Sequence, residues 1–534
     1  LTRPVEWLAT LHDLYGFKLL FMLFAAQHLL KGFAGTFVSQ PERFIYKSYH
    51  VEGPQVQIYM GVSGLPWAMK PIVGLLSDLV PIGGYNKRPY ILIASVLGVF
   101  SMVCLAFVQV PVIVIVLLFF CIALQRSVCD LLTEAKYAEA LKKKPQHGPD
   151  LMTFVWGGIE ISGLIALLFV GPLVEAIGPR KPYLILLPFA AMILYPTYKN
   201  YLDESKRTHA ETQEHRKKLV TENREVFGLC VLITGCTLAM TLSGILFTSV
   251  KVHALTALVV LIVILVSFSL VLRPEIAKMN AFFLLQGSLS IGISGASFYF
   301  FTDGPKEYPA GPHFSPTFFV TVLGITGSCC SLIGLAFYNR YLKDYTYTTL
   351  LTGTNILGSC LSLADLLVFT RGNLAWGIND HMFVLGGTVS ASLIGNWQWI
   401  PGVCMLSQMC PKNMEATLYA LLAGCHNLGN SISDYFGAFV LESLGCTPAG
   451  RPDEGATFEN LWFAALIGTT VPIVTLSLIP WMIPNARQTD TILSENPDSA
   501  TAGSLYSQWV MGAKKSSENG GRDGYGTVET NDGI

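Results

Sequence analysis

The stretch "GLPWAMKPIVGLLSD", residues 64–78, places a lysine in the middle of an apolar run. The run extends from residue 55 to residue 82, and Lys70 lies near its centre between two prolines. A helix of about 20 apolar residues crosses the roughly 30 Å of hydrocarbon in a bilayer. A lone charge at that depth costs at least about 2.5 to 3.5 kcal/mol, so it needs a partner or a wet cavity. We therefore interpret this stretch as a membrane helix whose lysine faces a cavity.

The composition of the whole chain is that of a membrane protein. Of its 534 residues 51% are hydrophobic and 13% are charged, and the mean hydropathy is +0.49. Soluble domains carry about 25% charged residues, so we predict an all-α integral membrane protein. About fourteen apolar stretches are long enough to span a bilayer. They are residues 17–38, 55–82, 89–108, 111–140, 150–175, 182–198, 226–248, 253–272, 280–301, 314–340, 347–370, 380–409, 414–441 and 458–482.

The loops and the cysteines limit the kind of protein further. With the N-terminus inside, seventeen Lys and Arg fall in inner loops and eight in outer loops, which predicts that both termini are cytoplasmic. The twelve cysteines lie mostly within spans and lack the spacing of metal ligands, so we expect neither a metal nor a cofactor. The sequence has no nucleotide-binding glycine loop and no nucleophile elbow, which argues against an enzyme and against ATP-driven transport.

Two of the predicted spans repeat each other. "GIEISGLIALLFVG" from residue 158 and "GCHNLGNSISDYFG" from residue 424 share three glycines at a constant offset of 266 residues. Glycines also recur by chance in membrane bundles, because they let helices approach closely. We favour a duplication, which predicts two six-helix bundles with an inserted helical hairpin. The predicted units are an N-terminal bundle at 1–198, a charged cytoplasmic linker at 199–225, the hairpin at 226–272, a C-terminal bundle at 273–484 and a disordered tail at 485–534.

Two cations lie too deep in the membrane to reach its surface easily. Lys70 and Arg126 each lie fifteen residues into spans that run in the same direction, so they share a depth of roughly 22 Å. Two cations at one level suit an anionic ligand. Alternatively, Asp130 neutralises Arg126 along one helical stripe, and Lys70 pairs with an acid elsewhere in the bundle. Lys31 is expected to extend to the outer interface.

Acidic residues and an imidazole near the midplane are candidates for carrying a proton. Asp130 and Glu134 follow Arg126 at intervals of four residues, so the three share a helical stripe. Glu160 and His426 occupy equivalent positions of the repeat. The alternative for Glu160 and His426 is that each makes a hydrogen bond that packs helices together.

A planar ligand needs surfaces on which it can stack. "NWQWIPG", residues 396–402, offers Trp397 and Trp399 on either side of Gln398. Tryptophan also anchors helices at the membrane interface, and this is the alternative interpretation. The candidate substrate-binding residues are thus Trp397, Gln398 and Trp399, together with Lys70 and Arg126.

Several motifs together resemble the folate/biopterin transporter family of the major facilitator superfamily, especially its members in trypanosomatid protozoa. The resemblance extends from about residue 5 to residue 481 and includes the opening stretch with its Gly-x-x-Ser-Asp motif at Gly74 to Asp78. The other motifs are "KRPY" at 87–90, "CDLLTEAKYAEAL" at 129–141, "FYFFTD" at 298–303, "YNRYLKD" at 338–344 and "CPKNMEATLYALLAGCHNLGNSISDYFGA" at 410–438.

The resemblance implies a fold, an activity and roles for residues. It implies a major-facilitator-like fold that transports folates or pterins by alternating access, with a proton as the co-substrate. Lys70 and Arg126 would hold the carboxylates of the glutamate tail of folate, with Trp397 and Trp399 beside the pterin ring. An inner gate would comprise Gly74, Asp78, Lys87, Arg88, Tyr338 and Arg340.

Within this gate Asp78 would brace the closed state against Lys87 and Arg88. The second half carries Tyr338 at the position equivalent to Asp78, so the charge network of the gate should be asymmetric.

Two other functions remain open at this point. Some members of the family carry S-adenosylmethionine, which is cationic and would prefer Asp130, Glu134 or Glu160. A nutrient sensor that keeps the fold and signals through the linker or the tail is the second alternative. In every case we expect a bilayer and a small-molecule ligand as partners and no nucleic acid, and we favour the plasma membrane over an organellar one.

Overall fold

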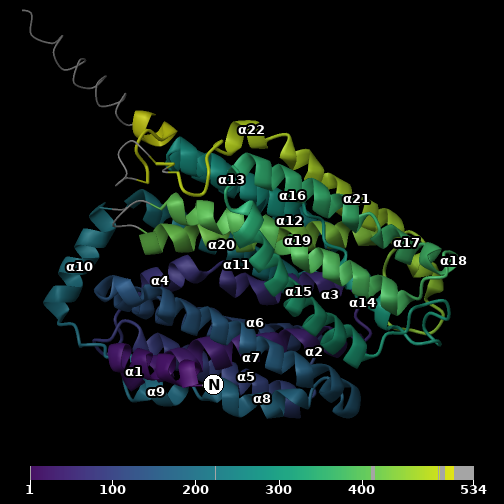
Figure 1. Cartoon of the computed structure of the whole chain (residues 1–534), viewed down its shortest axis with the longest axis horizontal. Helices are drawn as coiled ribbons and strands as arrows, with labels where there is room; N and C mark the ends of the chain where they lie inside the picture. The colour runs from purple at the N-terminus through teal and green to yellow at the C-terminus, as the bar shows by residue number, and fades with distance from the viewer. Residues whose placement is uncertain (1, 223, 411–414, 491, 494–499, 510–534) are drawn as a thin grey trace, which may run out of the picture.

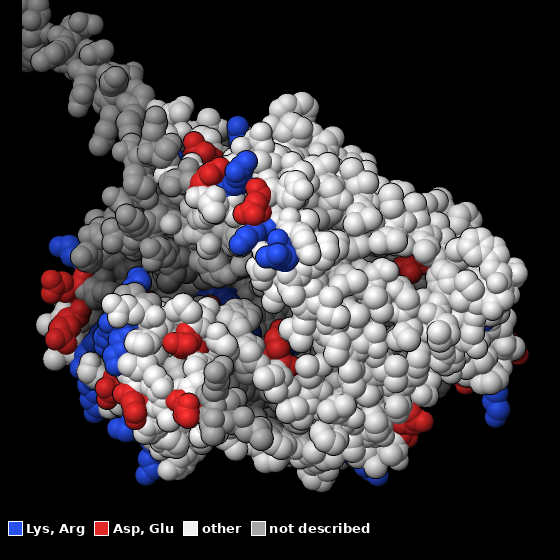
Figure 2. Space-filling model, in the orientation of Figure 1, with Lys and Arg blue, Asp and Glu red and all other residues white. Residues whose placement is uncertain are grey.

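The structure is a computed structural model that describes the chain except for residues 1, 223, 411–414, 491, 494–499 and 510–534. It is 79% helical, and its described residues contain no β-strand. Ten of the described helices are long and apolar enough to cross a membrane. Lys, Arg, Asp and Glu are sparse over most of the visible face and gather toward α10 (His209–Glu222) (Figure 2). The predicted all-α membrane fold is confirmed.

The N-terminal bundle forms one side of the molecule (Figure 1). Its elements are α1 (Thr2–Leu23), η1 (Phe24–Ala34), α2 (Gly35–Ser48), α3 (Gly53–Gly64), η2 (Leu65–Trp67), α4 (Lys70–Leu79), α5 (Arg88–Phe107), α6 (Val112–Lys143), η3 (Pro145–His147), α7 (Gly148–Ile177), α8 (Pro182–Ala191) and α9 (Leu194–Tyr198). After it come α10 and the hairpin α11 (Arg224–Leu246) and α12 (Val250–Val271).

The C-terminal bundle lies beside the first, as the green and yellow half of Figure 1 shows. Its elements are α13 (Pro274–Leu289), α14 (Ser294–Thr302), η4 (Thr317–Val322), α15 (Leu323–Phe337), η5 (Tyr338–Leu342), α16 (Tyr347–Ser362), α17 (Asp365–Phe369), α18 (Gly372–Ala375), α19 (Asp380–Gln408), α20 (Glu415–Ser443), η6 (Gly455–Phe458), α21 (Leu461–Leu476) and α22 (Ile479–Met482).

Four of the predicted spans are not among the ten long apolar helices of the described chain. They correspond to the broken pair α3 and α4, the short pair α8 and α9, and the helices α19 and α20. The count of about fourteen therefore stays a prediction, and so do the exact limits of the predicted units. The tail from residue 510 onward lies outside the described residues, whereas Ala486 accepts a backbone hydrogen bond from Tyr347 of α16 at 2.9 Å.

The first span is much longer than predicted. The sequence pattern ends it at residue 38, but the helical path of α1, η1 and α2 continues to Ser48 and contains Pro41. The segment after residue 38 looks like a loop because it combines a proline with charges. In the fold Glu42 is only 5% exposed, and its carboxylate accepts a hydrogen bond from Ser63 Oγ at 2.9 Å. Packing against α3 therefore satisfies a charge that the sequence pattern places outside the membrane.

The second predicted span is broken at the motif that opens the sequence. α3 ends at Gly64, a single 3₁₀ turn covers Leu65–Trp67, and α4 begins at Lys70. Pro71 stands in the first turn of α4, where its missing N–H costs no hydrogen bond. Trp67 and Lys70 are three residues apart and lie on the same side of the break, because Lys70 Nζ lies 4.7 Å from the centre of the Trp67 ring. The break thus presents an indole and an ammonium to the interior.

Both repeated spans pack closely against the first helix of their own bundle. α7 lies against η1, and a side chain added at Gly158 would collide with the ring of His28. α20 lies against α13, and a side chain added at Gly429 would come within 3.3 Å of the carbonyl oxygen of Leu284. Each repeat therefore uses a glycine to approach the first helix of its own bundle, but the two glycines are not paired by the 266-residue offset, and the duplication stays a prediction.

The linker and the hairpin connect the two bundles. α10 begins with a capping box, in which Thr208 N donates to Glu211 Oε2 at 2.8 Å and Glu211 N donates to Thr208 Oγ1 at 3.3 Å. The hairpin packs where α3 and α20 meet. Tyr435 of α20 donates its hydroxyl to the carbonyl of Met240 in α11 at 2.8 Å.

The two bundles are in close contact at the end of the molecule opposite α10. Lys47 Nζ lies 2.7 Å from Asp303 Oδ1, joining α2 to the end of α14. Gln57 of α3 donates to the carbonyls of Gly292 and Asp434 at 2.8 and 2.9 Å. Toward the α10 end, Figure 2 shows a hollow between the bundles. The molecule is therefore closed at one end and hollowed toward the other.

Candidate functional site

A buried aspartate holds two lysines inside the N-terminal bundle. Asp130 of α6 is 1% exposed, and its two oxygens lie 2.6 Å from Lys70 Nζ and 2.9 Å from Lys31 Nζ. The three side chains come from α4, η1 and α6. Lys31 was expected to extend to the outer interface, and this expectation is wrong because Asp130 offers it a buried partner. The group carries two positive charges and one negative charge.

Arg126 lies one helical turn before Asp130 and makes no ion pair within 4 Å among the described residues. Its Nε is buried without a hydrogen-bond partner there. The guanidinium carbon lies 5.7 Å from the centre of the Trp67 ring, and Lys70 Nζ lies 4.7 Å from the same ring. The alternative in which Asp130 neutralises Arg126 directly is thus not formed, because the two lysines occupy both carboxylate oxygens. Lys70 and Arg126 instead flank one indole.

The other predicted acids lie around this group but not in it. Glu134, half-buried on α6, accepts a hydrogen bond from the Tyr137 hydroxyl at 3.3 Å. Glu160 is exposed and lines a cavity of about 570 Å³ that Lys31 and Asn396 also line. This cavity lies between η1, α2 and α7 of one bundle and α15 and α19 of the other. Glu160 therefore shares a cavity with Lys31 but forms no ion pair with it within 4 Å.

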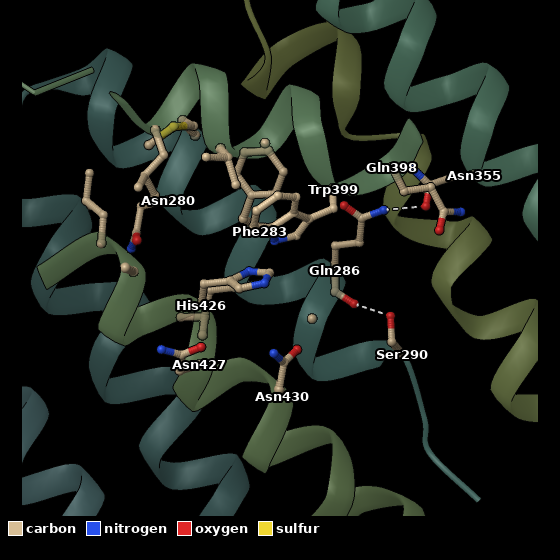
Figure 3. Close-up of a pocket in the computed structure, with 18 of the residues that line it drawn as sticks. Asn280, Phe283, Gln286, Ser290, Asn355, Gln398, Trp399, His426, Asn427 and Asn430 are labelled. Atoms are coloured by element: carbon tan, nitrogen blue, oxygen red, sulfur yellow. Dashed lines mark hydrogen bonds between the residues drawn. The ribbon is translucent and has the colours of Figure 1, made fainter. Parts of the chain in front are cut away.

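A second cavity of about 410 Å³ lies within the C-terminal bundle, between α13, α16, α19 and α20 (Figure 3). Its volume is in the range of about 300 to 1,000 Å³ that small-molecule pockets occupy. Three of the predicted site residues line it, namely Gln398, Trp399 and His426. The structure therefore brings His426 together with the Gln398–Trp399 pair and separates it from Glu160, which lines the other cavity.

Trp397 points elsewhere. Its indole Nε1 donates to the carbonyl of Gly334 at 2.9 Å, and its ring stacks on Phe337 with centroids 5.0 Å apart. Both partners belong to α15. Trp397 thus packs two helices together, because neighbouring residues of a helix point about 100° apart and cannot all face one cavity.

The predicted inner-gate residues do not form the expected network. Lys87 Nζ lies 2.8 Å from Glu139 Oε1, and Arg88 donates to the carbonyl of Tyr198 at 2.6 Å, so neither cation is bound to Asp78. The linker supplies Glu204, which accepts the backbone N–H groups of residues 86, 87 and 88 at 2.7 to 3.0 Å. The brace by Asp78 was predicted for a closed state, and this structure is hollowed at that end.

The counterpart of the gate in the C-terminal bundle is asymmetric in this structure. Tyr338 is buried in η5, where its hydroxyl accepts a hydrogen bond from Gln488. Arg340 is exposed two residues later. The remaining predicted gate residue, Gly74 of α4 in the N-terminal bundle, packs near Leu131. At the position equivalent to Asp78, the C-terminal bundle therefore has a neutral tyrosine hydroxyl that makes a hydrogen bond.

Three residues of the site were not identified from the sequence. Lys31 has its partner 99 positions away, so local spacing carries no signal for the pair. Trp67 lies three residues before Lys70, and that spacing would have been a usable signal for a shared side. Asn280 lines the C-terminal cavity at 4% exposure and has no charge or motif that distinguishes it in the sequence.

Comparisons with known proteins show what the chain is similar to. A model of the BT1 family matches residues 31–501. "Probable folate-biopterin transporter 6" of Arabidopsis thaliana is 25% identical over 92% of this chain and 88% of the relative. "Folate-biopterin transporter" of Synechocystis sp. is 25% identical over 82% of this chain and 77% of the relative. "Folate transporter 1" of Plasmodium falciparum is 20% identical over 84% of this chain and 76% of the relative.

Solved structures of transporters share the fold. A peptide transporter POT in complex with sulfate superposes with a TM-score of 0.60 at 14% identity, covering 87% of this chain and 95% of that chain. The nucleoside transporter NupG superposes with a TM-score of 0.53 at 13% identity, covering 87% of this chain and 99% of that chain. At these identities the likeness concerns the fold alone, which is of the major facilitator type. The resemblance inferred from the motifs is confirmed, and this chain is a multi-pass membrane transporter, not an enzyme, that belongs to the BT1 family.

Proposed function

We propose that the protein is a secondary transporter that carries folate or biopterin across a membrane by proton symport with alternating access. The names of its relatives supply the substrate class. The single observation that carries the proposal is the guanidinium of Arg126, which lies beside Trp67 without an ion pair among the described residues. An unpaired cation inside a membrane bundle calls for an anionic guest, and the glutamate tail of folate provides carboxylates.

The charges around Asp130 favour an anionic substrate over a cationic one. Asp130 is the buried carboxylate that a sulfonium would approach, but Lys31 and Lys70 already occupy both of its oxygens. Arg126 is a third cation nearby, and the acids that act on the three cations without an ion pair are Glu42 beside Arg126 and Glu134 beside Lys31 and Lys70. At Asp130 a sulfonium would therefore meet two ammonium groups, whereas a carboxylate of folate would be attracted by the same groups. This supports the folate and pterin assignment.

The closed and hollow ends of the molecule support alternating access. If both termini are cytoplasmic, as the loop charges predict, the hollow beside α10 faces the cytoplasm. The contacts of Lys47 and Gln57 with the C-terminal bundle would then close the outer end. Transport requires these contacts to break while new ones form near α10. The structure thus corresponds to an inward-facing state in this proposal.

Uptake into proteoliposomes tests the proposed function. Purified full-length protein should accumulate labelled folate or biopterin, and an inward-directed proton gradient should stimulate the uptake. Excess unlabelled folate should compete, whereas excess S-adenosylmethionine should not. Saturable binding without any flux would instead indicate a sensor and would contradict the proposal.

Replacing Lys47 by Met should shift the population toward the state that is open at the outer end. The side chain of Asp303 is 0% exposed, so removing its partner leaves a buried carboxylate uncompensated. Breaking such a pair costs about 3 to 5 kcal/mol, and water reaches Asp303 only when the bundles separate there. Distances between spin labels on α2 and α14 should lengthen in K47M. Lys306→Met, which replaces an exposed lysine at the same end, is the control. Equal distances between the spin labels in the two variants would show that the Lys47–Asp303 pair does not hold the outer end closed.

Replacing Glu134 by Gln should separate proton movement from substrate movement. Glu134 interacts electrostatically with Asp130 and Lys70 but has no cation within 4 Å among the described residues, so it is free to exchange a proton. In E134Q the proton gradient should no longer stimulate uptake, while exchange of labelled for unlabelled substrate should continue. Glu139→Gln on the same helix, whose carboxylate pairs with Lys87, should keep the stimulation. Gradient-driven uptake by E134Q would exclude Glu134 as the coupling group.

A further inference from the structure

We infer that the cavity of the C-terminal bundle binds the flat pterin ring, while the cations of the N-terminal bundle bind the carboxylates of the glutamate tail. This inference rests on the proposed function and assigns each part of the substrate to one bundle. The cavity is the one shown in Figure 3, with a volume of about 410 Å³. It contains no Lys, Arg, Asp or Glu among its lining residues, so its chemistry is that of neutral polar recognition.

Carboxamides dominate the polar lining of this cavity. Each carboxamide presents one acceptor and two donors, and the pyrimidine edge of a pterin, with its amino and oxo groups, presents both kinds of group side by side. Such an edge can therefore both donate to and accept from the amides, whereas a carboxylate can only accept. Figure 3 shows the labelled amides coming from different helices toward the cavity. The amides are Asn280, Gln286, Asn355, Gln398, Asn427 and Asn430.

Asn280 is a member of this set whose buried amide has only a weak protein partner. It is 4% exposed, and its Nδ2 makes no hydrogen bond of good geometry among the described residues, although the amide interacts with the thiol of Cys425, a weak hydrogen-bonding group. A buried donor without an acceptor costs about 1 to 3 kcal/mol. By contrast, Gln286 Nε2 donates to Asn355 Oδ1 at 2.9 Å, which orients both amides. A hydrogen-bond acceptor on the ligand would pair with the Nδ2 of Asn280 and remove the free-energy cost of burying that donor unpaired.

Aromatic side chains provide the stacking surfaces that a flat ring needs. Phe283 of α13, Trp399 of α19 and Tyr419 of α20 line the cavity, and the first two are labelled in Figure 3. Trp399 is 53% exposed, although it is a residue that usually buries most of its surface in a core. A stacked ligand would cover this exposed indole.

The cavity is connected to the cations of the other bundle through Trp67. Asn427, which lines the cavity, donates to the carbonyl of Trp67 at 3.4 Å, and the Trp67 ring lies beside Lys70 and Arg126. Tyr419 interacts electrostatically with Glu134 and Asp130 across the same boundary. A ligand with its ring in the cavity and its tail at Arg126 would therefore touch both bundles. Its binding would then favour closure of the bundles around it.

Three ligands that carry the two parts separately test this division. Biopterin has the ring without the carboxylates, p-aminobenzoylglutamate has the carboxylates without the ring, and folate has both. Equilibrium binding of each is measured on the purified full-length wild type and on Asn280→Leu and Arg126→Ala. N280L should bind biopterin and folate about tenfold more weakly and p-aminobenzoylglutamate unchanged, as loss of about one hydrogen bond implies. R126A should bind p-aminobenzoylglutamate and folate more weakly and biopterin unchanged.

Two controls keep the test decisive. Asn339→Leu removes an exposed amide of the same bundle and should bind all three ligands like the wild type. If N280L does not fold, Asn430→Ala, at an exposed position of the same cavity, should give the same selective loss. Equal weakening of biopterin and p-aminobenzoylglutamate by the cavity variants, or unchanged biopterin binding, would overturn the inference. A wild type that binds none of the three ligands would instead overturn the proposed function.

Discussion

Folate binding by Arg126→Ala is expected to be roughly 30- to 150-fold weaker than binding by the wild type. Hydrogen bonds to charged groups contribute up to about 3 kcal/mol, and each 1.4 kcal/mol changes affinity tenfold. Arg126 has no ion pair within 4 Å among the described residues, and its buried Nε has no hydrogen-bond partner there, so it can donate to a carboxylate. Lys70 is already bound to Asp130, and we therefore expect a smaller direct loss for Lys70→Ala. Isotherms with labelled folate measure both.

Two variants show whether the loss reflects recognition or folding. Arg126→Lys keeps the charge but loses the planar fork that holds a carboxylate by two bonds, so it should recover only part of the affinity. Arg451→Ala removes an exposed arginine from a loop and should bind like the wild type. If R126A binds folate normally while remaining folded, Arg126 is not the anion-binding group.

Asp130→Asn should destabilise the protein more than any other single change at the site. The aspartate holds Lys31 and Lys70 within 2.9 Å, and neither ammonium has another acid within 4 Å among the described residues. Removing one partner of a buried ion pair costs about 3 to 5 kcal/mol, and here two cations lose the same partner. The melting temperature of the purified D130N protein should fall well below that of the wild type, as size-exclusion profiles after heating would show.

A matched set of variants isolates the charge effect. Adding Lys31→Met to D130N removes one uncompensated ammonium, and adding Lys70→Met as well removes the other, so each step should restore part of the lost stability. Free-energy changes of residues in contact do not add, and the difference between the combined variant and the sum of the single variants measures the coupling within the group. A D130N protein as stable as the wild type would contradict the charge balance described for this bundle.

Much of the fold could be predicted from the sequence because membrane spans have a strong and local signal. The apolar stretches and the depth shared by Lys70 and Arg126 both depend on counting along one chain. Lys70 and Arg126 are indeed close to the same Trp67 ring. The predicted end of the first span was wrong because Pro41 and Glu42 look like loop residues until Ser63 of another helix accommodates the carboxylate.

The arrangement of the site was less accessible because it depends on contacts between distant helices. Lys31 and Asp130 are 99 residues apart, so the sequence gives no local signal for their ion pair. The four-residue spacing instead suggested that Asp130 pairs with Arg126. Trp397 and Trp399 could not be told apart by pattern, although one packs on α15 and the other lines a cavity. Neutral amides such as Asn280 give no signal in a single sequence, since their role appears only where four helices meet.

A cryo-electron microscopy map of the full-length protein with folate bound would show directly whether Arg126 binds the substrate. We expect ligand density between the two bundles, with the carboxylates of the tail within hydrogen-bonding distance of the Arg126 guanidinium. Density that lies elsewhere, with Arg126 contacting only protein groups, would contradict the claim that cations inside the N-terminal bundle bind the substrate.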